Sequence, residues 1–345
     1  MVKKRMLFAL CSILLLTACN DEKDKAVQDE RDDVEEAGVA EKLPYTTPFT
    51  GEAVAEEPVL RPILVTVNNH PDARPQSGIA YADVVYEMLA EGDVTRFLAL
   101  YQSQLPSNIG PVRSARSYFI DIAEGLDAFY IAHGYSPEAK SMLSSGVVDN
   151  INGMQYDGTL FKRSSERKAP HNSYIEGGDI TAAAEKVGAS LVYQKKISYS
   201  FYEEQDSVKI GLDANQVAMN YGKNTTFNSV YTYHKESNTY GRQSANKDTV
   251  DYLTGEPVAL SNVLFFEMAH RTIDREGRRE IDITSGGKAY VVQQGMLREV
   301  NWKNRDGLLV AVEDDGSDVK LVAGQTWIHF VPTSPGLASS VTYSE

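Results

Sequence analysis

Cysteine is almost absent from this chain. Among its 345 residues only Cys11 and Cys19 occur, and both lie near the N-terminus. Cys11 falls in an apolar stretch that is predicted to be cleaved off, and Cys19 stands at the predicted cleavage site. The expected mature protein therefore has no thiol for a disulfide, a redox pair or a nucleophile, which excludes a large set of enzyme classes.

Long hydrophobic runs and familiar catalytic motifs are also missing. No run of about 18 apolar residues occurs, so the sequence predicts no membrane-spanning helix. The chain contains no HExxH, GxSxG or P-loop pattern. No motif therefore indicates a known hydrolase mechanism or a nucleotide-binding site. We predict no cofactor.

The chain has fewer basic than acidic residues. The 48 Asp and Glu residues outnumber the 34 Lys and Arg residues, and the formal net charge is −14. Residues 20–58 alone hold 13 acids and four bases. This segment shows no sustained apolar period, so we predict a disordered acidic tether, with a helix over 24–42 as the alternative. An acidic surface argues against nucleic acid as a partner.

The N-terminal residues are typical of a bacterial lipoprotein signal. Residues 3–5 (KKR) are positive, residues 6–16 form an apolar segment of 11 residues, and LTAC at 16–19 resembles a lipobox. A plain secretory signal is the alternative. We predict a signal peptide over 1–18 and diacylglycerol and fatty acyl chains on Cys19. These chains would anchor the protein to the extracytoplasmic face of the cell membrane.

Residues 59–195 predict a three-layer α/β domain with a mixed sheet. Apolar runs without polar alternation are typical of strands buried on both faces, and a turn at 91–93 makes a hairpin of two of them. Helical spacing and caps separate the runs. The expected strands are 61–67, 82–89, 95–101 and 127–132, and the expected helices are 114–126, 137–144 and 179–187.

Residues 196–335 predict a mostly β domain, because short strand-like runs alternate with turn clusters. The last ten residues, 336–345, are expected to be a flexible tail. The expected strands are 197–202, 229–234, 239–242, 263–269, 289–293, 308–312 and 326–331.

Several ordered motifs resemble the YerB-type lipoprotein family of Firmicutes. In chain order they are NNHPDARPQSG, AEGDVTRFLALYQSQLP, GPVRSAR, HG, PHNSY, GRREID, GGK and AGQTWIHFVP. The resemblance covers nearly all of residues 59–332. It implies two adjoining domains of unknown function with a boundary near 195–225, and a lipid anchor outside a Gram-positive membrane. It implies no established activity.

Two arginines stand at the start of the predicted helix over 114–126. Arg113 and Arg116 are three residues apart, where the positive end of a helix dipole disfavours cations. Something anionic is expected to offset them. Either internal acids do so, with Glu87, Glu91 and Asp93 as candidates, or an anionic ligand does.

A third arginine, Arg96, lies inside an apolar strand. Arginine is almost never fully buried alone, so we expect either a pair with Glu87 across the hairpin or a place in a site. Convergence of the three guanidinium groups on an open cleft would favour a ligand, whereas burial of each against a carboxylate would favour internal salt bridges.

Three histidines follow strands or lie in polar loops, namely His70, His133 and His171. Their spacings match no metal motif, so we predict no metal site and expect hydrogen-bonded histidines. The residues proposed to bind a ligand are Asn68, Asn69, His70, Glu87, Glu91, Arg96, Arg113, Arg116, His133, His171 and Asn172.

The leading hypothesis is a lipid-anchored binding or accessory protein of the cell envelope, with an anion-binding site in the N-terminal domain. Its ligand would be an anionic or cell-wall molecule. The first alternative is an enzyme that uses the arginines on phosphorylated or lipid-pyrophosphate cell-wall intermediates. The second is a structural interaction module for an envelope protein partner, which predicts an exposed apolar patch on the β region.

Overall fold

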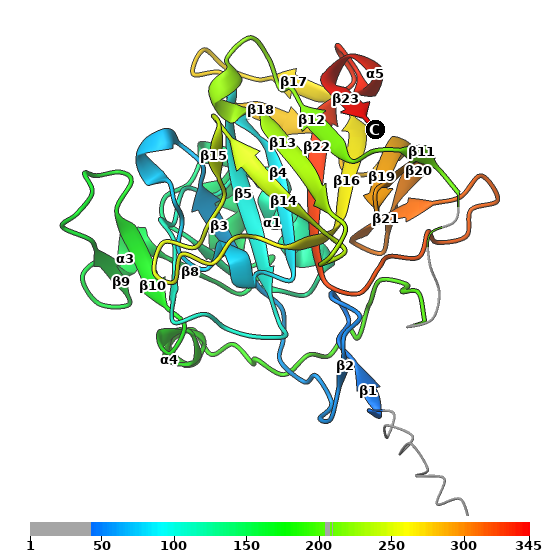
Figure 1. Ribbon diagram of the computed structural model, residues 1–345. Coiled ribbons are helices and arrows are strands. Elements are labelled where there is room, and N and C mark those ends of the chain that lie inside the picture. The colour runs from blue at the N-terminus through cyan, green and yellow to red at the C-terminus, as the bar shows by residue number, and fades with distance from the viewer. Residues whose placement is uncertain (1–42, 204–207, 209) are drawn as a thin grey trace, which may run out of the picture. The chain divides into compact units, whose positions relative to one another are not determined.

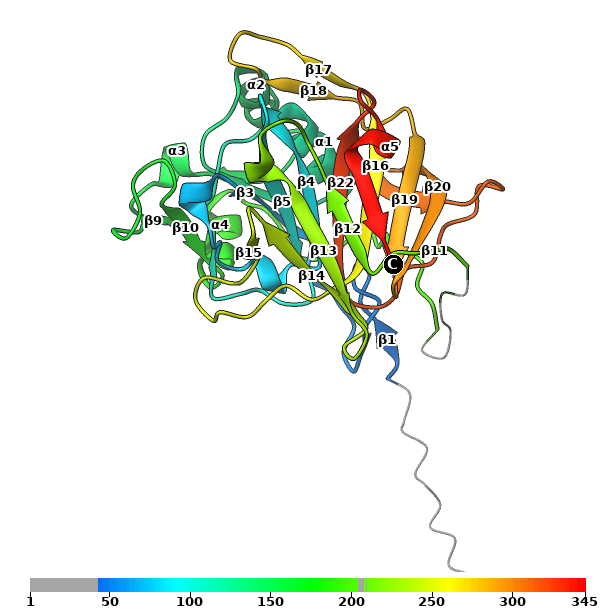
Figure 2. The same cartoon turned by 45° about the horizontal axis from the view of Figure 1, so that its top comes forward.

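The computed structural model describes residues 43–203, 208 and 210–345. The predicted signal peptide, Cys19 and the tether up to residue 42 lie outside the described residues. The described chain is mostly β, with one large sheet and three small ones (Figures 1 and 2). Within it, no helix has both the length and the apolar character needed to cross a membrane.

The large sheet has 16 strands drawn from both halves of the sequence. Its main path runs in this order: β23 (Val341–Ser344), β12 (Gln216–Met219), β13 (Ser229–His234), β14 (Thr239–Ser244), β16 (Leu260–Met268), β22 (Gln325–Pro332), β4 (Val84–Glu91), β5 (Val94–Tyr101), β3 (Ile63–Asn68), β7 (Phe129–Ala132) and β8 (Asn150–Asn152). Five more strands branch from this path: β11 (Leu212–Asp213), β15 (Lys247–Asp248), β19 (Gly287–Gln293), β20 (Met296–Arg305) and β21 (Leu308–Val312).

The remaining elements are small sheets, short helices and 3₁₀ turns. The small sheets are β1 (Tyr45–Thr46) with β2 (Ala53–Val54), β6 (Asn108–Ile109) with β10 (Ser173–Glu176) and β9 (Phe161–Arg163), and β17 (His270–Thr272) with β18 (Arg279–Ile281). The helices are α1 (Ser117–Gly125), α2 (Pro137–Ser145), α3 (Gly153–Tyr156), α4 (Asp179–Lys186) and α5 (Leu337–Ser340), and the 3₁₀ turns are η1 (Pro71–Ala73), η2 (Ile79–Tyr81) and η3 (Thr225–Phe227).

The two halves of the sequence meet where β22 lies parallel to β4. The described residues from 43 onward form one compact unit, and this strand pair runs through it. The sheet around β4 is mixed, because β5 is antiparallel to both β4 and β3, whereas β7 is parallel to β3. The division into two domains at residue 195, and the three-layer description of the first, stay predictions.

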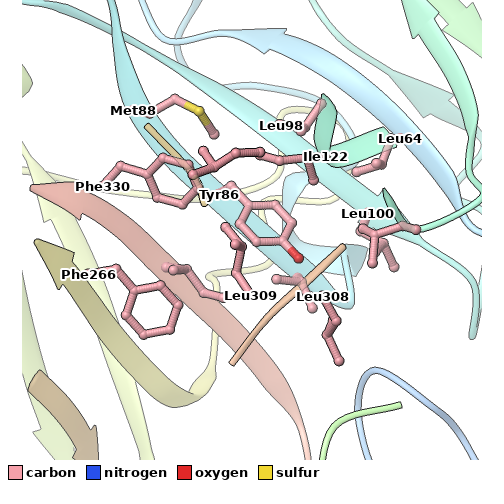
Figure 3. Close-up of a cluster of buried hydrophobic side chains, with 14 of the residues drawn as sticks. Leu64, Tyr86, Met88, Leu98, Leu100, Ile122, Phe266, Leu308, Leu309 and Phe330 are labelled. Atoms are coloured by element: carbon pink, nitrogen blue, oxygen red, sulfur yellow. The ribbon is translucent and has the colours of Figure 1, made fainter. Parts of the chain in front are cut away.

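Strand alternation sorts side chains between two hydrophobic clusters, one on each face of the sheet. On one face, Tyr86 and Leu98 pack with Ile122 of α1 and Leu308 of β21 (Figure 3). On the other face, Val85 and Phe97 join the cluster that also contains Trp327 of β22 and Ile180 of α4. Every residue of β3 is buried, as the unbroken apolar run predicted.

Several sequence expectations are confirmed. The hairpin of β4 and β5, the strand β7 and the helix α2 all occur as predicted. Ser136 is the N-cap of α2, and Gly146 ends the helix in the left-handed conformation (φ 74°). Most of the expected C-terminal strands also occur. Residues 197–202 are an exception, because Phe201 makes only an isolated bridge, to Leu321.

The ends of the folded part were predicted wrongly. Residues 43–58 are not all tether, since they contain the β1–β2 hairpin and the fully buried side chain of Phe49. The tail over 336–345 is also structured: α5 buries Leu337, and β23 pairs with β12. A single buried apolar residue in a polar context, such as Phe49, is too weak a signal to detect by period.

Candidate functional site

The candidate residues gather around the carboxyl ends of the parallel strands β3 and β7, but they do not form one site. The segment 110–116 crosses between these ends. There the Arg113 N–H donates to Thr66 O (2.8 Å), and the His133 N–H donates to Arg113 O (2.9 Å). Carboxyl ends of parallel strands are where α/β sheets tend to place ligands. Tertiary contacts divide the candidates into four groups.

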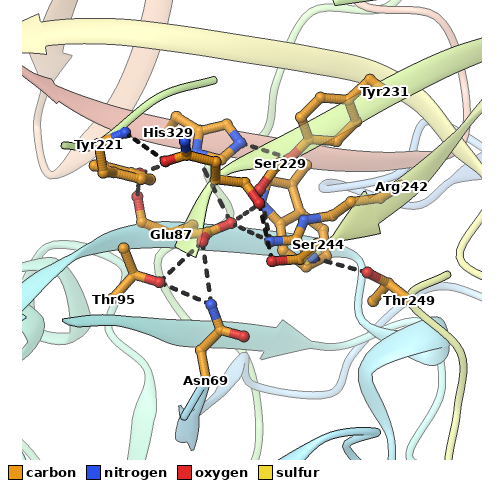
Figure 4. Close-up of polar contacts among 12 residues, drawn as sticks. Asn69, Glu87, Thr95, Tyr221, Ser229, Tyr231, Arg242, Ser244, Thr249 and His329 are labelled. Atoms are coloured by element: carbon orange, nitrogen blue, oxygen red, sulfur yellow. Dashed lines mark hydrogen bonds and ion pairs between the residues drawn. The ribbon is translucent and has the colours of Figure 1, made fainter. Parts of the chain in front are cut away.

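The first group is the core network around Glu87, whose side chain is 0% exposed (Figure 4). Its carboxylate accepts hydrogen bonds from Arg242 (2.9 Å) and from Trp327 Nε1 (3.0 Å) in the C-terminal half. It also accepts from Thr95 Oγ1 (3.0 Å) and Asn69 Nδ2 (3.2 Å). Burial alone would raise the pKa of Glu87, but the charge of Arg242 and the hydrogen bond from Thr95 hold the pKa below its usual value. Glu87 is therefore an ionised, sealed carboxylate.

His329 closes this core network on its other side. The Tyr221 hydroxyl donates to Glu87 O (2.8 Å), so its oxygen is left to accept from His329 Nδ1 (2.9 Å). His329 Nε2 then accepts from the Tyr231 hydroxyl at 2.5 Å. Burial lowers the pKa of His329 to about 4, although Glu87 acts in the opposite direction. The imidazole is thus neutral and fully hydrogen-bonded.

Arg242 is the partner of Glu87 that sequence reasoning missed. Its guanidinium lies over the Trp327 ring, 4.6 Å from the centroid, and also faces Phe97. The sequence separation of 155 residues left no local signal for this ion pair. The predicted pair between Arg96 and Glu87 is wrong, because Arg96 lies opposite Met88 and Glu87 lies opposite Phe97. Successive residues of a strand point to opposite faces, so Arg96 and Glu87 are on different sides of the sheet.

The second group consists of Glu91 and two arginines that bind it, Arg96 and Arg116. Glu91 accepts from Arg96 Nη2 (2.5 Å) through one oxygen and from Arg116 through the other. The side chains of Arg96 and Arg116 are 3% and 8% exposed, so both charges are internal. Burial would raise the pKa of Glu91, but the two arginines lower it.

The expectation that Arg113 and Arg116 both stand in the first turn of a helix is wrong for Arg113, whereas Arg116 does stand at the helix start. The helix α1 begins at Ser117, and Arg116 is its N-cap with extended backbone (φ −131°, ψ 157°). Arg113 lies three residues earlier, in the segment that crosses between β3 and β7. A dipole acts within the first turn, so it does not account for the placement of Arg113.

The third group, which we call the edge cluster, contains Asn68, His70, Asp72, Arg113 and His171. Within the described residues, the Arg113 guanidinium makes no hydrogen bond or ion pair, and its Nε is buried without a partner. Burial lowers the pKa of Arg113, against the effect of Glu91. Arg113 is close enough to His171 to contribute, after burial and His70, to a lowered pKa of that imidazole.

No feature of the sequence pairs His70 with His171, but their side chains are in contact in the structure. The rings of His70 and His171 stack with centroids 4.5 Å apart. Asn68 joins them, since its Oδ1 accepts from the His70 N–H (2.9 Å) and its Nδ2 lies 2.8 Å from His171 Nδ1. Asp72 was missed, although its position two residues after His70 was a usable signal.

His133 belongs to the fourth group and does not join the edge cluster. Its Nδ1 lies 2.7 Å from Ser173 Oγ, and its Nε2 lies 3.0 Å from Arg163 Nη2. Arg163 also donates to Asn172 Oδ1 (3.1 Å) and forms an ion pair with Asp157. Burial and then Arg163 lower the pKa of His133. Arg163 further lines a neighbouring cleft of about 340 Å³.

Comparison with known proteins places this architecture in a class without an established activity. The chain matches the family described as "Protein of unknown function (DUF3048)", with its N-terminal domain at residues 49–190 and its C-terminal domain at 217–328. The chain belongs to this family. The Glu87–Arg242 ion pair therefore joins the two matched regions.

A particular relative is known from Bacillus subtilis. The chain is 42% identical over 325 residues to the protein of strain 168 named "Putative lipoprotein YerB", covering 94% of each chain. The crystal structure of YerB protein from Bacillus subtilis superposes with a TM-score of 0.80 at 42% identity and covers 88% of this chain and all of that one. The name of the relative agrees with the expectation of a lipoprotein.

Proposed function

We propose that this chain is a lipid-anchored extracytoplasmic protein of the cell envelope that binds an anionic ligand at the edge cluster. The anchor is supported by the lipobox at residues 16–19 and by the name of the Bacillus subtilis relative. With two acyl signals, such an anchor would hold stably without a membrane-spanning helix.

The observation that carries the binding function is the unpaired guanidinium of Arg113. Three guanidinium groups lie near Glu91, whose single carboxylate neutralises only one of their charges. This part of the protein therefore carries excess positive charge, although the whole chain has a net charge of −14. Arg96 and Arg116 share that carboxylate, and Arg113 has no bonded partner of its own. A half-buried arginine that has lost water without gaining a carboxylate would bind an incoming anion strongly.

The geometry does not favour the alternative of an enzyme that uses all three arginines. Arg96 and Arg116 are committed to Glu91, and Glu87 is sealed in the core network. Glu87 is therefore unable to hold a cation or to act as a base towards a bound substrate. A phosphate or pyrophosphate group fits the planar donor array of Arg113 without any chemical step.

Binding is tested with inorganic pyrophosphate, the charged group of a lipid pyrophosphate, by following thermal unfolding of the full-length protein in detergent. We expect pyrophosphate to raise the Tm more than sodium chloride of equal ionic strength does. Arg113→Gln should abolish the extra rise, whereas Arg271→Gln, a matched control whose side chain is 73% exposed, should retain it. No extra rise in the wild type, or an equal rise in Arg113→Gln, would refute the proposal.

The anchor has a separate test in Cys19→Ala. The variant cannot carry acyl chains at residue 19, so its gel mobility should change, and any chains that still lose the signal peptide should leave the membrane fraction. A variant that stays in the membrane with unchanged mobility would contradict lipidation at Cys19.

A further inference from the structure

The side chains of His70, Asp72 and His171 converge beside the carboxyl end of β3. One nitrogen or oxygen from each of the three side chains lies within 4.8 Å of the other two. We propose that this trio binds a divalent transition-metal ion, with Zn²⁺ as the best fit. Metal binding at these residues does not depend on the anion-binding function proposed above.

The chemistry of the donors fits a metal of intermediate softness. Imidazole nitrogen suits Zn²⁺ and its neighbours in the first transition row, and a carboxylate completes a mixed set. Two histidines and one acid are three protein ligands, which leaves a tetrahedral zinc ion one position for water or another ligand. Sites with an open position are those in which zinc interacts with small molecules.

The distances are close to what coordination requires. Ligand atoms around tetrahedral zinc are separated by about 3.4 Å, given zinc–nitrogen distances of about 2.0–2.1 Å. His70 Nδ1 and Asp72 Oδ2 are already 3.7 Å apart. The Asp72 side chain is 73% exposed, so it is free to rotate and close the remaining gap. To bind one ion, the three ligand atoms must draw together from the present 4.8 Å, and the two stacked imidazole rings must turn so that a nitrogen lone pair of each faces the ion.

Local structure holds the two histidines in place. His70 is the N-cap of η1, where its Nδ1 accepts from the Asp72 N–H. The cap keeps His70 and Asp72 close, and an ion bound at Nδ1 would take the lone pair that now accepts this hydrogen bond. Asn68 contacts both the backbone of His70 and the ring of His171. Asn68 Nδ2 is a donor, so it occupies the lone pair of His171 Nδ1, and an ion bound at that nitrogen would displace it. Asn68 thus links ligands that are 101 residues apart in the sequence.

The charges in the edge cluster determine which kind of ligand would bind at the fourth coordination position of the ion. The carboxylate of Asp72 neutralises only half of a divalent charge, and Arg113 adds a positive charge nearby. An anion would therefore be favoured as the remaining ligand, shared between the metal and Arg113. This last link rests on the proposed function, whereas metal binding itself does not.

The direct test is isothermal titration of zinc chloride into the chelator-treated full-length protein in detergent. We expect one ion per chain, with affinity lowered by more than about tenfold in His70→Ala, in His171→Ala and in Asp72→Asn. His234→Ala is the matched control, because His234 is exposed on β13, and it should bind as the wild type does. Circular dichroism would confirm that each variant is folded.

Visible absorption of bound Co²⁺ provides a second readout, because it reports the ligands rather than the fold. The wild type should show the d–d bands of a four-coordinate nitrogen and oxygen site, and the His70→Ala/His171→Ala double variant should lose them. Absence of zinc uptake in the wild type, or undiminished uptake in the double variant, would overturn the proposal. A pyrophosphate-induced Tm rise that survives added EDTA would show that anion binding stands without the metal.

Discussion

The core network and the edge cluster each contain histidine and a charged side chain that is withdrawn from water. They differ in whether that side chain has hydrogen-bond partners within the protein. In the core network, every oxygen of Glu87 has protein donors, and both nitrogens of His329 are hydrogen-bonded. In the edge cluster, Arg113 has no bonded partner within the described residues. A perturbed pKa marks both places. The decisive difference is the counter-ion, because Arg242 is paired with Glu87 although its Nε has no partner in the described part of the chain, whereas Arg113 has no ion pair there.

The largest expected effect comes from breaking the core network. Glu87→Gln keeps the shape of the side chain but leaves Arg242 buried without its counter-charge, which typically costs about 3–5 kcal/mol. Urea denaturation followed by fluorescence would measure the loss. The double variant Glu87→Gln/Arg242→Met removes both charges and should recover part of the stability. A single variant within about 1 kcal/mol of the wild type would show that the buried pair is not needed.

The next effect is a pH dependence that originates at His329. Its pKa is about 4 in the folded protein and near 6.5 in an unfolded chain, so the unfolded chain binds more protons between these values. The contribution of His329 to stability is therefore present above pH 6.5 and lost as the pH falls towards 4. Its size is on the order of 3 kcal/mol.

The measurement compares the unfolding free energies of wild type and His329→Gln from pH 7 to pH 4. Asp83, whose pKa is raised to about 6 by burial, acts in the opposite direction, and His270 acts in the same direction. The informative quantity is therefore the difference between the two proteins, which should narrow as the pH falls. His234→Ala should track the wild type throughout. A difference that stays constant with pH would mean that His329 does not titrate as described.

The smallest expected effect on stability belongs to Arg113→Gln. The change removes a half-buried cation that lies near Arg116 and has no bonded partner, so we expect the free energy of unfolding to stay within about 1 kcal/mol of the wild type or to rise slightly. Urea denaturation without added anions is the check. A loss above about 2 kcal/mol would place Arg113 among the structural residues, and the contrast with Glu87 would disappear.

Sequence period was a good guide to elements and a poor guide to partners. The apolar run of β3 and the hairpin of β4 and β5 were predictable because burial leaves a period in the chain. The same alternation, applied to register, would have placed Arg96 and Glu87 on opposite faces. Arg242 was out of reach, because an ion pair between distant strands depends on how the strands are ordered in the sheet.

By itself, the sequence determined the lack of thiols in the expected mature chain, the acidic balance, the LTAC segment that resembles a lipobox, most strands and the family. These properties are local, since they depend on residue type and spacing along a short stretch. Only the tertiary structure decided which charges neutralise one another. It joined β22 to β4, sealed Glu87 against Arg242, and brought His171 beside His70 and Asp72. Electrostatic partnership depends on distance and burial in three dimensions, and neither is encoded by separation along the chain.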